Sequence, residues 1–267
     1  DIFMLKHRTI TALILFVITC SIIFYAPPLI FASCWWLLCL IAIYELAKMY
    51  RFNLTQIIAL MALSSAAVIG IALANYDLSQ LIRIISVTTW CFVIPLTLIF
   101  VPKKFSKSTI SVFALILFIP AYYAINVLHA FLGPWQLISI MMIAWVADTG
   151  AYFVGKAFGK RKLAPQISPG KSIEGALGGF ALVVIYLITL KGLNLVDYLP
   201  TYGTAFKFAF ILTAISIVGD LFESWLKRVA QVKDSGTILP GHGGVFDRID
   251  SLIAVVAIAF AIIRGML

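Results

Sequence analysis

The sequence is dominated by a succession of apolar segments, each long enough to cross a lipid bilayer as an α-helix. A helix rises about 1.5 Å per residue, so about 20 apolar residues span roughly 30 Å of hydrocarbon. Such segments lie at about 10–26, 29–47, 54–74, 79–101, 108–128, 134–154, 174–191, 204–226 and 250–264. The pattern predicts an all-α, polytopic integral membrane protein: a helical bundle of about nine transmembrane helices.

The composition excludes a water-soluble globule. Only 12% of the 267 residues are charged and the mean hydropathy is +1.07, so polar surface is too scarce to cover a soluble protein of this size. The sequence shows no internal repeat and no soluble domain, and Gly175, Gly178 and Gly179 predict close contact between helices. We expect one membrane-embedded domain over 1–267, with 1–130 mainly scaffold and 131–267 catalytic.

The distribution of basic residues predicts the orientation. If the N-terminus is cytoplasmic, nine crossings place sixteen of the twenty Lys and Arg residues on the cytoplasmic side. Only Arg83, Lys191, Lys207 and Arg264 fall on the other side. Cytoplasmic loops of membrane proteins are enriched in basic residues, so this orientation is favoured. The net charge of +9 then reflects topology and attraction to anionic lipids, and no nucleic acid partner is expected.

The acidic residues concentrate in the second half of the chain. Charge near membrane depth is costly, so carboxylates there indicate a functional site that faces the bundle interior or an aqueous cavity. The alternative is a set of salt bridges between helices. Seven of the eleven acids belong to this group: Asp148, Glu174, Asp220, Glu223, Asp234, Asp247 and Asp250.

Helical spacing places several of these carboxylates at one level. Asp220, Glu223 and Lys227 stand at i, i+3 and i+7, which puts them on one stripe of the eighth segment. Asp247 and Asp250 repeat the spacing at the start of the ninth segment, and Asp148 lies near the end of the sixth. Three helix ends are thus predicted to direct carboxylates toward one cytoplasm-facing level.

The residue types around this level favour a hard cation and phosphate groups. Oxygen ligands without nearby Cys suit Mg²⁺ better than zinc. Lys171 and Ser172 end the sequence Ser-Pro-Gly-Lys-Ser, and His242 lies within Pro-Gly-His-Gly-Gly. Glycines let backbone N–H groups approach an anion closely. A Walker A loop would need glycine at position 165, which is Pro165, so a P-loop NTPase is disfavoured.

The polar stretch 224–250 resembles a known family signature. It reads Ser224-x-Leu226-Lys227-Arg228, then Lys233-Asp234-x-Gly236, then Leu239-Pro240-x-His242-Gly243-Gly244-x-x-Asp247-Arg248-Ile249-Asp250. This pattern closely resembles the signature of the phosphatidate cytidylyltransferases, also called CDP-diacylglycerol synthases. Blocks at 148–152, 155–163, 168–175 and 219–224 are similar to other parts of that family. The first half of the chain matches only in length and hydrophobic character.

The resemblance implies a reaction between a soluble nucleotide and a membrane lipid. CTP and phosphatidic acid would condense to CDP-diacylglycerol and pyrophosphate in the cytoplasmic (inner) membrane, among membrane lipids, with the active site facing the cytoplasm. The nucleophile would be a phosphate monoester oxygen, largely ionised at neutral pH, so no strong general base is needed. The site must instead bring two polyanions together and stabilise the developing charge.

The resemblance also implies roles for individual residues. Asp220 and Asp247 would bind Mg²⁺, with Glu223 and Asp250 as helpers, and a second cation is an open alternative. The catalytic set is Asp220, Asp247, Lys227, Arg228, His242 and Asp250. The substrate- and phosphate-binding set is Lys171, Ser172, Glu174, Asp148, Ser224, Lys233, Asp234, Gly243, Gly244 and Arg248.

Other functions stay open at this point. A CTP-dependent polyprenol kinase shares general features of the C-terminal half, but it would use a lipid alcohol, need a general base and release CDP. An ion-coupled transporter also holds carboxylates among helices, although transporters commonly carry repeats or paired broken helices, and neither is visible here. The sequence leaves the oligomeric state open, with a homodimer as one alternative.

Overall fold

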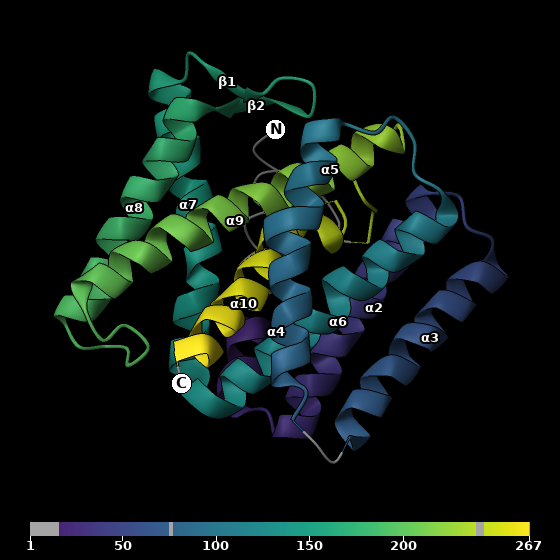
Figure 1. Ribbon diagram of the computed structural model, residues 1–267, viewed down its shortest axis with the longest axis horizontal. Helices are drawn as coiled ribbons and strands as arrows, with labels where there is room; N and C mark the ends of the chain where they lie inside the picture. Colours follow the sequence, from purple (N-terminus) through teal and green to yellow (C-terminus); the bar gives the residue numbers. More distant parts are fainter. Residues whose placement is uncertain (1–15, 75–76, 239–242, 267) are drawn as a thin grey trace.

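The computed structural model describes residues 16–74, 77–238 and 243–266, which form a bundle of helices with one small hairpin (Figure 1). A short apolar helix over Phe16–Tyr25 precedes the labelled elements. These follow in chain order as α2 (Pro28–Met49), α3 (Leu54–Leu73), α4 (Ser79–Thr88), η1 (Thr89–Val93), α5 (Ile94–Phe100), α6 (Lys107–Leu132), α7 (Pro134–Phe158), β1 (Lys162–Ala164), β2 (Ser168–Ser172), α8 (Ile173–Gly192), α9 (Tyr202–Val229) and α10 (Phe246–Met266).

The polytopic helical class predicted from the sequence is confirmed. In the described part of the chain, eight helical stretches are long and apolar enough to cross a membrane, and they coincide with the second to ninth predicted segments. Of the first predicted segment, residues 10–15 lie outside the described residues. The prediction placed the start of the ninth segment at 250, whereas α10 begins at Phe246. Asp247 and Asp250 therefore lie inside the first turns of this helix.

The fourth predicted segment is one continuous path with a local change of helical winding. α4, η1 and α5 follow one another without a break, and η1 is a π-helical turn. Pro95 lies in the first turn of α5. Because proline has no N–H to donate and its ring crowds the preceding turn, the wider winding just before it accommodates the ring without ending the span.

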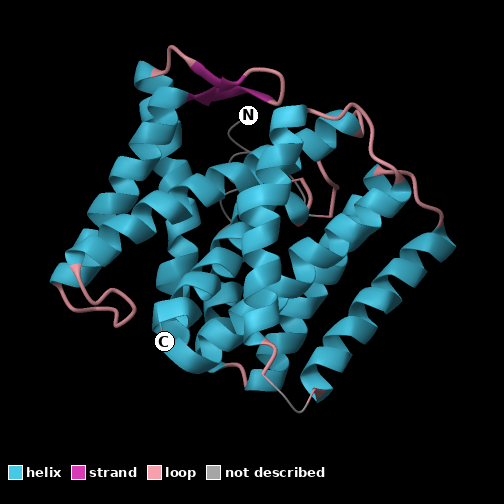
Figure 2. Ribbon diagram, viewed as in Figure 1, coloured by secondary structure: helices cyan, strands magenta, loops and turns pink. Residues whose placement is uncertain are grey.

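A two-stranded hairpin between α7 and α8 was not predicted (Figure 2). β1 and β2 pair antiparallel, with Lys162 opposite Ser172 and Ala164 opposite Ser168. Glu174 holds the approach to β1, because its carboxylate accepts hydrogen bonds from the backbone N–H groups of Lys160 and Arg161, each at 3.1 Å. The Arg161 side chain adds an ion pair at 2.9 Å. We call the end of the bundle that carries this hairpin the hairpin end.

Basic residues gather at the hairpin end. The connections α2–α3, α5–α6, α7–α8 and α9–α10 all lie there in Figure 1. Fourteen of the eighteen described Lys and Arg residues stand in or beside these connections. Arg83, Lys191, Lys207 and Arg264 stand near the opposite end, so the three-dimensional arrangement reproduces the charge asymmetry expected from the sequence.

α10 is the central helix and the most deeply buried of the candidate spans. α9 crosses the bundle obliquely beside it (Figure 1). The two helices meet closely at Gly219, where an added Cβ atom would lie 2.9 Å from the Asp250 carbonyl oxygen and 3.1 Å from Ser251 Cα. This close approach brings the acidic residues of α9 and α10 to the same level.

α7 and α8 pack through small residues, as the glycines of the seventh segment predicted. A Cβ atom on Gly179 would lie 2.6 Å from the Ala147 carbonyl oxygen, and one on Gly175 would lie 2.8 Å from the Ala151 carbonyl oxygen. Membrane helices commonly associate through such close backbone contacts. Because the hairpin connects α7 to α8, this close packing also fixes the distance between the two ends of the hairpin.

Replacing Gly179 by Ala is expected to destabilise the protein by about 2 kcal/mol, because the methyl group forces α7 and α8 apart. Gly70→Ala in α3 is the matched control, since an added Cβ there meets nothing within 4 Å. The control should be neutral or slightly stabilising because alanine favours helix. Thermal unfolding of the detergent-solubilised variants measures both effects. Equal unfolding temperatures for the two variants would contradict the close-packing account.

Candidate functional site

A cavity of about 470 Å³ opens beside the hairpin, between α7, α8, α9 and β2. Ligand pockets commonly have volumes of about 300–1,000 Å³, so this one can hold a substantial part of a nucleotide or a lipid head group. Its lining includes four residues predicted from the sequence to belong to the site: Asp148, Lys171, Ser172 and Asp220. Tyr152 and Lys156 of α7 also line it. Predicted site residues that lie far apart in the sequence therefore line one cavity.

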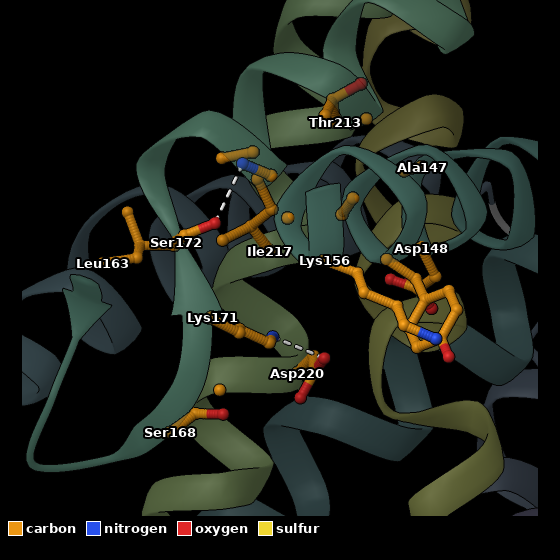
Figure 3. Close-up of a pocket in the computed structure, with 17 residues that line it drawn as sticks. Ala147, Asp148, Lys156, Leu163, Ser168, Lys171, Ser172, Thr213, Ile217 and Asp220 are labelled. Carbon is orange, nitrogen blue, oxygen red and sulfur yellow. Dashed lines mark hydrogen bonds and ion pairs between the residues drawn. The ribbon is translucent and has the colours of Figure 1, made fainter. Parts of the chain in front are cut away.

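Lys171 and Asp220, which both line the cavity, form an ion pair. Lys171 extends from β2 and Asp220 from α9, and Figure 3 shows the two side chains pointing toward each other. Each side chain is 26% exposed, so both groups remain accessible from the cavity. Ser224, one turn along α9, donates a hydrogen bond to the other Asp220 oxygen at 3.3 Å. The hairpin thus places a cation directly beside a carboxylate of the transmembrane bundle.

Ser172 joins the hairpin to α8. Its hydroxyl oxygen accepts the Gly175 N–H at 3.1 Å and so caps the first turn of α8. Side-chain oxygens of Ser satisfy helix N-termini in this way. Because Lys171 directly precedes Ser172, this cap also fixes the backbone position from which the Lys171 side chain extends. Ser172 is therefore placed beside the predicted phosphate site with a definite structural role.

A second charged cluster lies one to two turns further along α9. Lys227 makes ion pairs at 2.7 Å with both Glu223 and Asp247. The exposed fractions of the three side chains are 13%, 2% and 9% in that order, so the cluster is buried. The second Glu223 oxygen has no hydrogen-bond partner among the described residues. Glu223 and Asp247 therefore form salt bridges, which was the alternative to a functional role, although both were also predicted to belong to the site.

Asp247 is fixed by the chain on both sides of residues 239–242. One of its oxygens binds Lys227, and the other accepts hydrogen bonds from the Gly244 N–H at 2.8 Å and from the Ser235 N–H at 3.0 Å. The Ser235 hydroxyl adds a contact at 3.0 Å. Gly243 has φ +82°, a left-handed conformation that favours glycine. The predicted Gly243 and Gly244 thus shape the approach to Asp247.

Asp250 is close enough to interact electrostatically with the cavity residues Asp148 and Asp220 and with Glu223 of the Lys227 cluster. Its own carboxylate accepts the Ser251 N–H at 2.7 Å. The three helix ends therefore bring their carboxylates to one level, as the helical spacing predicted.

Glu45 of α2, which was not among the predicted site residues, contacts the chain segments that hold Asp247. It is 1% exposed and its carboxylate contacts the start of α10, accepting the N–H groups of Val245 at 3.1 Å and Phe246 at 2.9 Å. The Ser235 hydroxyl lies 3.2 Å from the same carboxylate. An acid inside an apolar segment was the available signal, because the rule that selected the second-half carboxylates applies equally to Glu45.

The remaining predicted residues lie around these two groups. Lys233, Asp234 and Arg248 are exposed, outside the described lining of the cavity. Arg228 is also exposed, and its side chain donates to the Ile167 carbonyl at 3.3 Å, tying the end of α9 to the hairpin. Glu174 binds the 160–161 backbone instead of facing the cavity. His242 lies outside the described residues.

The oxygen donors suit a magnesium ion that arrives with its phosphate ligands. Mg²⁺ is usually held by one or two carboxylates together with substrate phosphates. Asp220 and Asp250 can provide such donors: Asp220 is paired with Lys171 but remains 26% exposed, whereas Glu223 and Asp247 are buried with Lys227. Among the residues described, no group of three or more His, Cys, Asp or Glu side chains forms a metal cage. The four predicted ligands are thus divided between two neighbouring groups.

Comparisons with known proteins agree with the residue pattern. The family model described as "Cytidylyltransferase family" matches residues 6–266. A phosphatidate cytidylyltransferase of Pseudomonas aeruginosa is 36% identical, covering 97% of each chain. One from Staphylococcus haemolyticus is 32% identical over 94% of this chain and 96% of its own. One from Haemophilus influenzae is 51% identical over 46% of this chain and 44% of its own. The chain therefore belongs to the cytidylyltransferase family.

Proposed function

We propose that this protein transfers the cytidylyl group of CTP to phosphatidic acid and yields CDP-diacylglycerol and pyrophosphate. The observation that carries the proposal is the convergence of Asp148, Asp220 and Lys171 on one cavity at the hairpin end, inside a membrane-spanning bundle. A water-soluble triphosphate and a membrane-borne phosphate can meet at such a place. The named relatives perform chemistry of this class.

The reaction forms one phosphoanhydride bond and breaks another. A phosphate oxygen of phosphatidic acid attacks the α-phosphorus of CTP, and the bond to the β-phosphate breaks as pyrophosphate leaves. The second pKa of a phosphate monoester is about 6, so the nucleophile is already largely ionised at neutral pH. No residue has to remove a proton. The protein must instead orient two polyanions and offset their charge.

Lys171 is placed to neutralise phosphate charge in the cavity, because its side chain is accessible and held at the wall by Asp220. Lys156 lines the opposite side of the same cavity (Figure 3). Lys227, fixed by Glu223 and Asp247, offsets the negative charge of these two carboxylates beside the cavity group. The exposed Arg228, Lys233 and Arg248 surround the hairpin end and attract the nucleotide from solution.

Mg²⁺ is part of the proposal, with Asp220 and Asp250 as its protein ligands. When bound there with substrate phosphates, the ion supplies positive charge to the triphosphate oxygens. The all-oxygen donor set and the position of both carboxylates at the level of the cavity support this assignment. Asp148 contributes further negative charge from α7.

The proposed location is the cytoplasmic membrane, with the hairpin end in the cytoplasm. The concentration of Lys and Arg at that end supports this orientation, because basic loops are retained in the cytoplasm. A triphosphate is too highly charged to cross hydrocarbon unaided, so cytoplasmic CTP would reach the site from the cytoplasmic side. The lipid substrate would reach the cavity from the surrounding leaflet.

The proposal is tested with purified protein in mixed micelles of detergent and phosphatidic acid, supplied with CTP and Mg²⁺. We expect pyrophosphate and CDP-diacylglycerol in equal amounts, and no product after EDTA treatment until excess Mg²⁺ is restored. Diacylglycerol and a polyprenol serve as lipid alcohol controls and should not react. Turnover of a lipid alcohol with release of CDP would replace the proposal by a lipid kinase.

A further inference from the structure

The start of α10 depends on an acidic residue from a distant helix. The first N–H groups of a helix have no partner within that helix and need an acceptor from elsewhere. At α10 the acceptor is Glu45, which binds the N–H groups of Val245 and Phe246 from α2, 200 residues away in the sequence. The positive end of the helix dipole also favours a carboxylate at this position. Glu45 thus caps α10 from outside.

The fit around Glu45 is close on every side. An added Cβ atom on Gly236 or Gly244 would overlap the Glu45 carboxylate, and the Ser235 hydroxyl lies within hydrogen-bond distance. The residues just before and just after 239–242 therefore pack on one carboxylate. Because Glu45 is 1% exposed, it has little freedom to move away.

Ser235 connects Glu45 to the charged cluster. Its hydroxyl lies 3.2 Å from Glu45 and 3.0 Å from Asp247, and the Asp247 N–H donates to the hydroxyl oxygen at 3.3 Å. Asp247 in turn holds Lys227 at 2.7 Å. If Glu45 moved, Ser235 and the first turn of α10 would move with it. The positions of Asp247, Lys227 and Asp250 would change as a result.

We propose that Glu45 is a positioning residue for the reaction: it sets the axial position and rotation of the first α10 turn, and thereby the placement of Asp247 and Asp250. This inference rests on the proposed function and adds to it a residue from the half of the chain expected to be mainly scaffold. Glu45 does not line the cavity, so it acts through other residues. A shift of about 1 Å in a positioned group can cost roughly a hundredfold in rate.

Glu45→Gln is the decisive variant because it keeps the shape and removes the charge. Two backbone N–H donors face the two carboxylate oxygens, and an amide offers only one oxygen, so one of the two contacts becomes donor against donor. Glu45→Asp keeps the charge but shortens the reach by one methylene. Tyr50→Phe is the matched control, since it removes the 2.9 Å hydrogen bond from the end of α2 to the Leu226 carbonyl and leaves α10 untouched.

The experiment measures kcat and KM for CTP and phosphatidic acid per folded molecule, well below the unfolding temperature, with amide hydrogen exchange over 243–247. For Glu45→Gln we expect at least a tenfold lower kcat, since a displaced group costs up to about a hundredfold. Its KM for phosphatidic acid should be unchanged and exchange should rise at the start of α10. Glu45→Asp should fall between it and wild type. Tyr50→Phe should stay within about twofold of wild type.

Two results would overturn the inference. One is a Glu45→Gln enzyme whose kcat per folded molecule equals that of wild type, because Glu45 would then contribute to folding alone. The other is an equal fall in kcat for Tyr50→Phe. Failure of the proposed function itself looks different, since wild-type protein would then form no CDP-diacylglycerol, while hydrogen exchange would still report whether Glu45 holds α10.

Discussion

Asp220→Asn is expected to lower the turnover of CTP and phosphatidic acid by at least about a hundredfold. The substitution keeps the shape of the side chain but removes the negative charge that holds Lys171 at the cavity wall, and it replaces one of the two oxygens proposed for Mg²⁺ by an amide nitrogen that cannot bind the ion. The protein should remain folded, because both partners of the ion pair are partly exposed and the liberated lysine stays hydrated. Pyrophosphate release and CDP-diacylglycerol formation measure the loss.

Asp197→Asn is the matched control for that experiment. Asp197 lies near the opposite end of the bundle, where it accepts a hydrogen bond from the Gln136 side chain at 2.8 Å. The same chemical change there should alter turnover by less than about twofold. Full activity of Asp220→Asn, with normal folding, would refute the roles assigned to Asp220.

Lys227→Met is expected to destabilise the protein by about 3–5 kcal/mol, because it removes one partner from a buried charge cluster. Glu223 and Asp247, whose side chains are 2% and 9% exposed, would face each other without a compensating cation. The unfolding temperature should fall by on the order of 10 °C. Turnover should be lost as well, since Asp247 would lose the cation that pairs with one of its two oxygens, although Ser235 and Gly244 still bind the other.

The double variant Lys227→Met/Glu223→Gln separates stability from activity. Removing the Glu223 charge relieves part of the repulsion, so the unfolding temperature should recover toward that of wild type. Turnover should not recover, because the cation beside Asp247 is still missing. A single Lys227→Met variant as stable as wild type would mean that the cluster carries no net electrostatic stabilisation.

The sequence predicted the class of fold, and it singled out several residues that the structure places around one cavity, because both depend on local patterns. A run of about twenty apolar residues is sufficient to define a membrane helix, since the bilayer thickness sets the required length. Spacing along one helix is enough to align Asp220, Glu223 and Lys227. Glycines in the seventh segment were likewise sufficient to predict the close contact of α7 and α8.

Contacts between distant segments could not be obtained in this way. The β1–β2 hairpin consists of short strands in a polar connection, where neither hydrophobic periodicity nor length distinguishes a strand from a loop. Glu45 stood alone in its segment, so no spacing linked it to the residues that it binds. The division of the predicted metal ligands between a cavity group and a Lys227 group depends on which lysine reaches which carboxylate.

The sequence by itself determined that this protein crosses a membrane many times, that its charges gather at one end, and which side chains line individual helix faces. The physical reason is that bilayer thickness and helix periodicity act on neighbouring residues. Only the tertiary structure decided that Lys171 meets Asp220, that Lys227 joins Glu223 to Asp247, and that Glu45 caps α10. These pairings depend on how helices pack, and packing brings together residues that no sequence period connects.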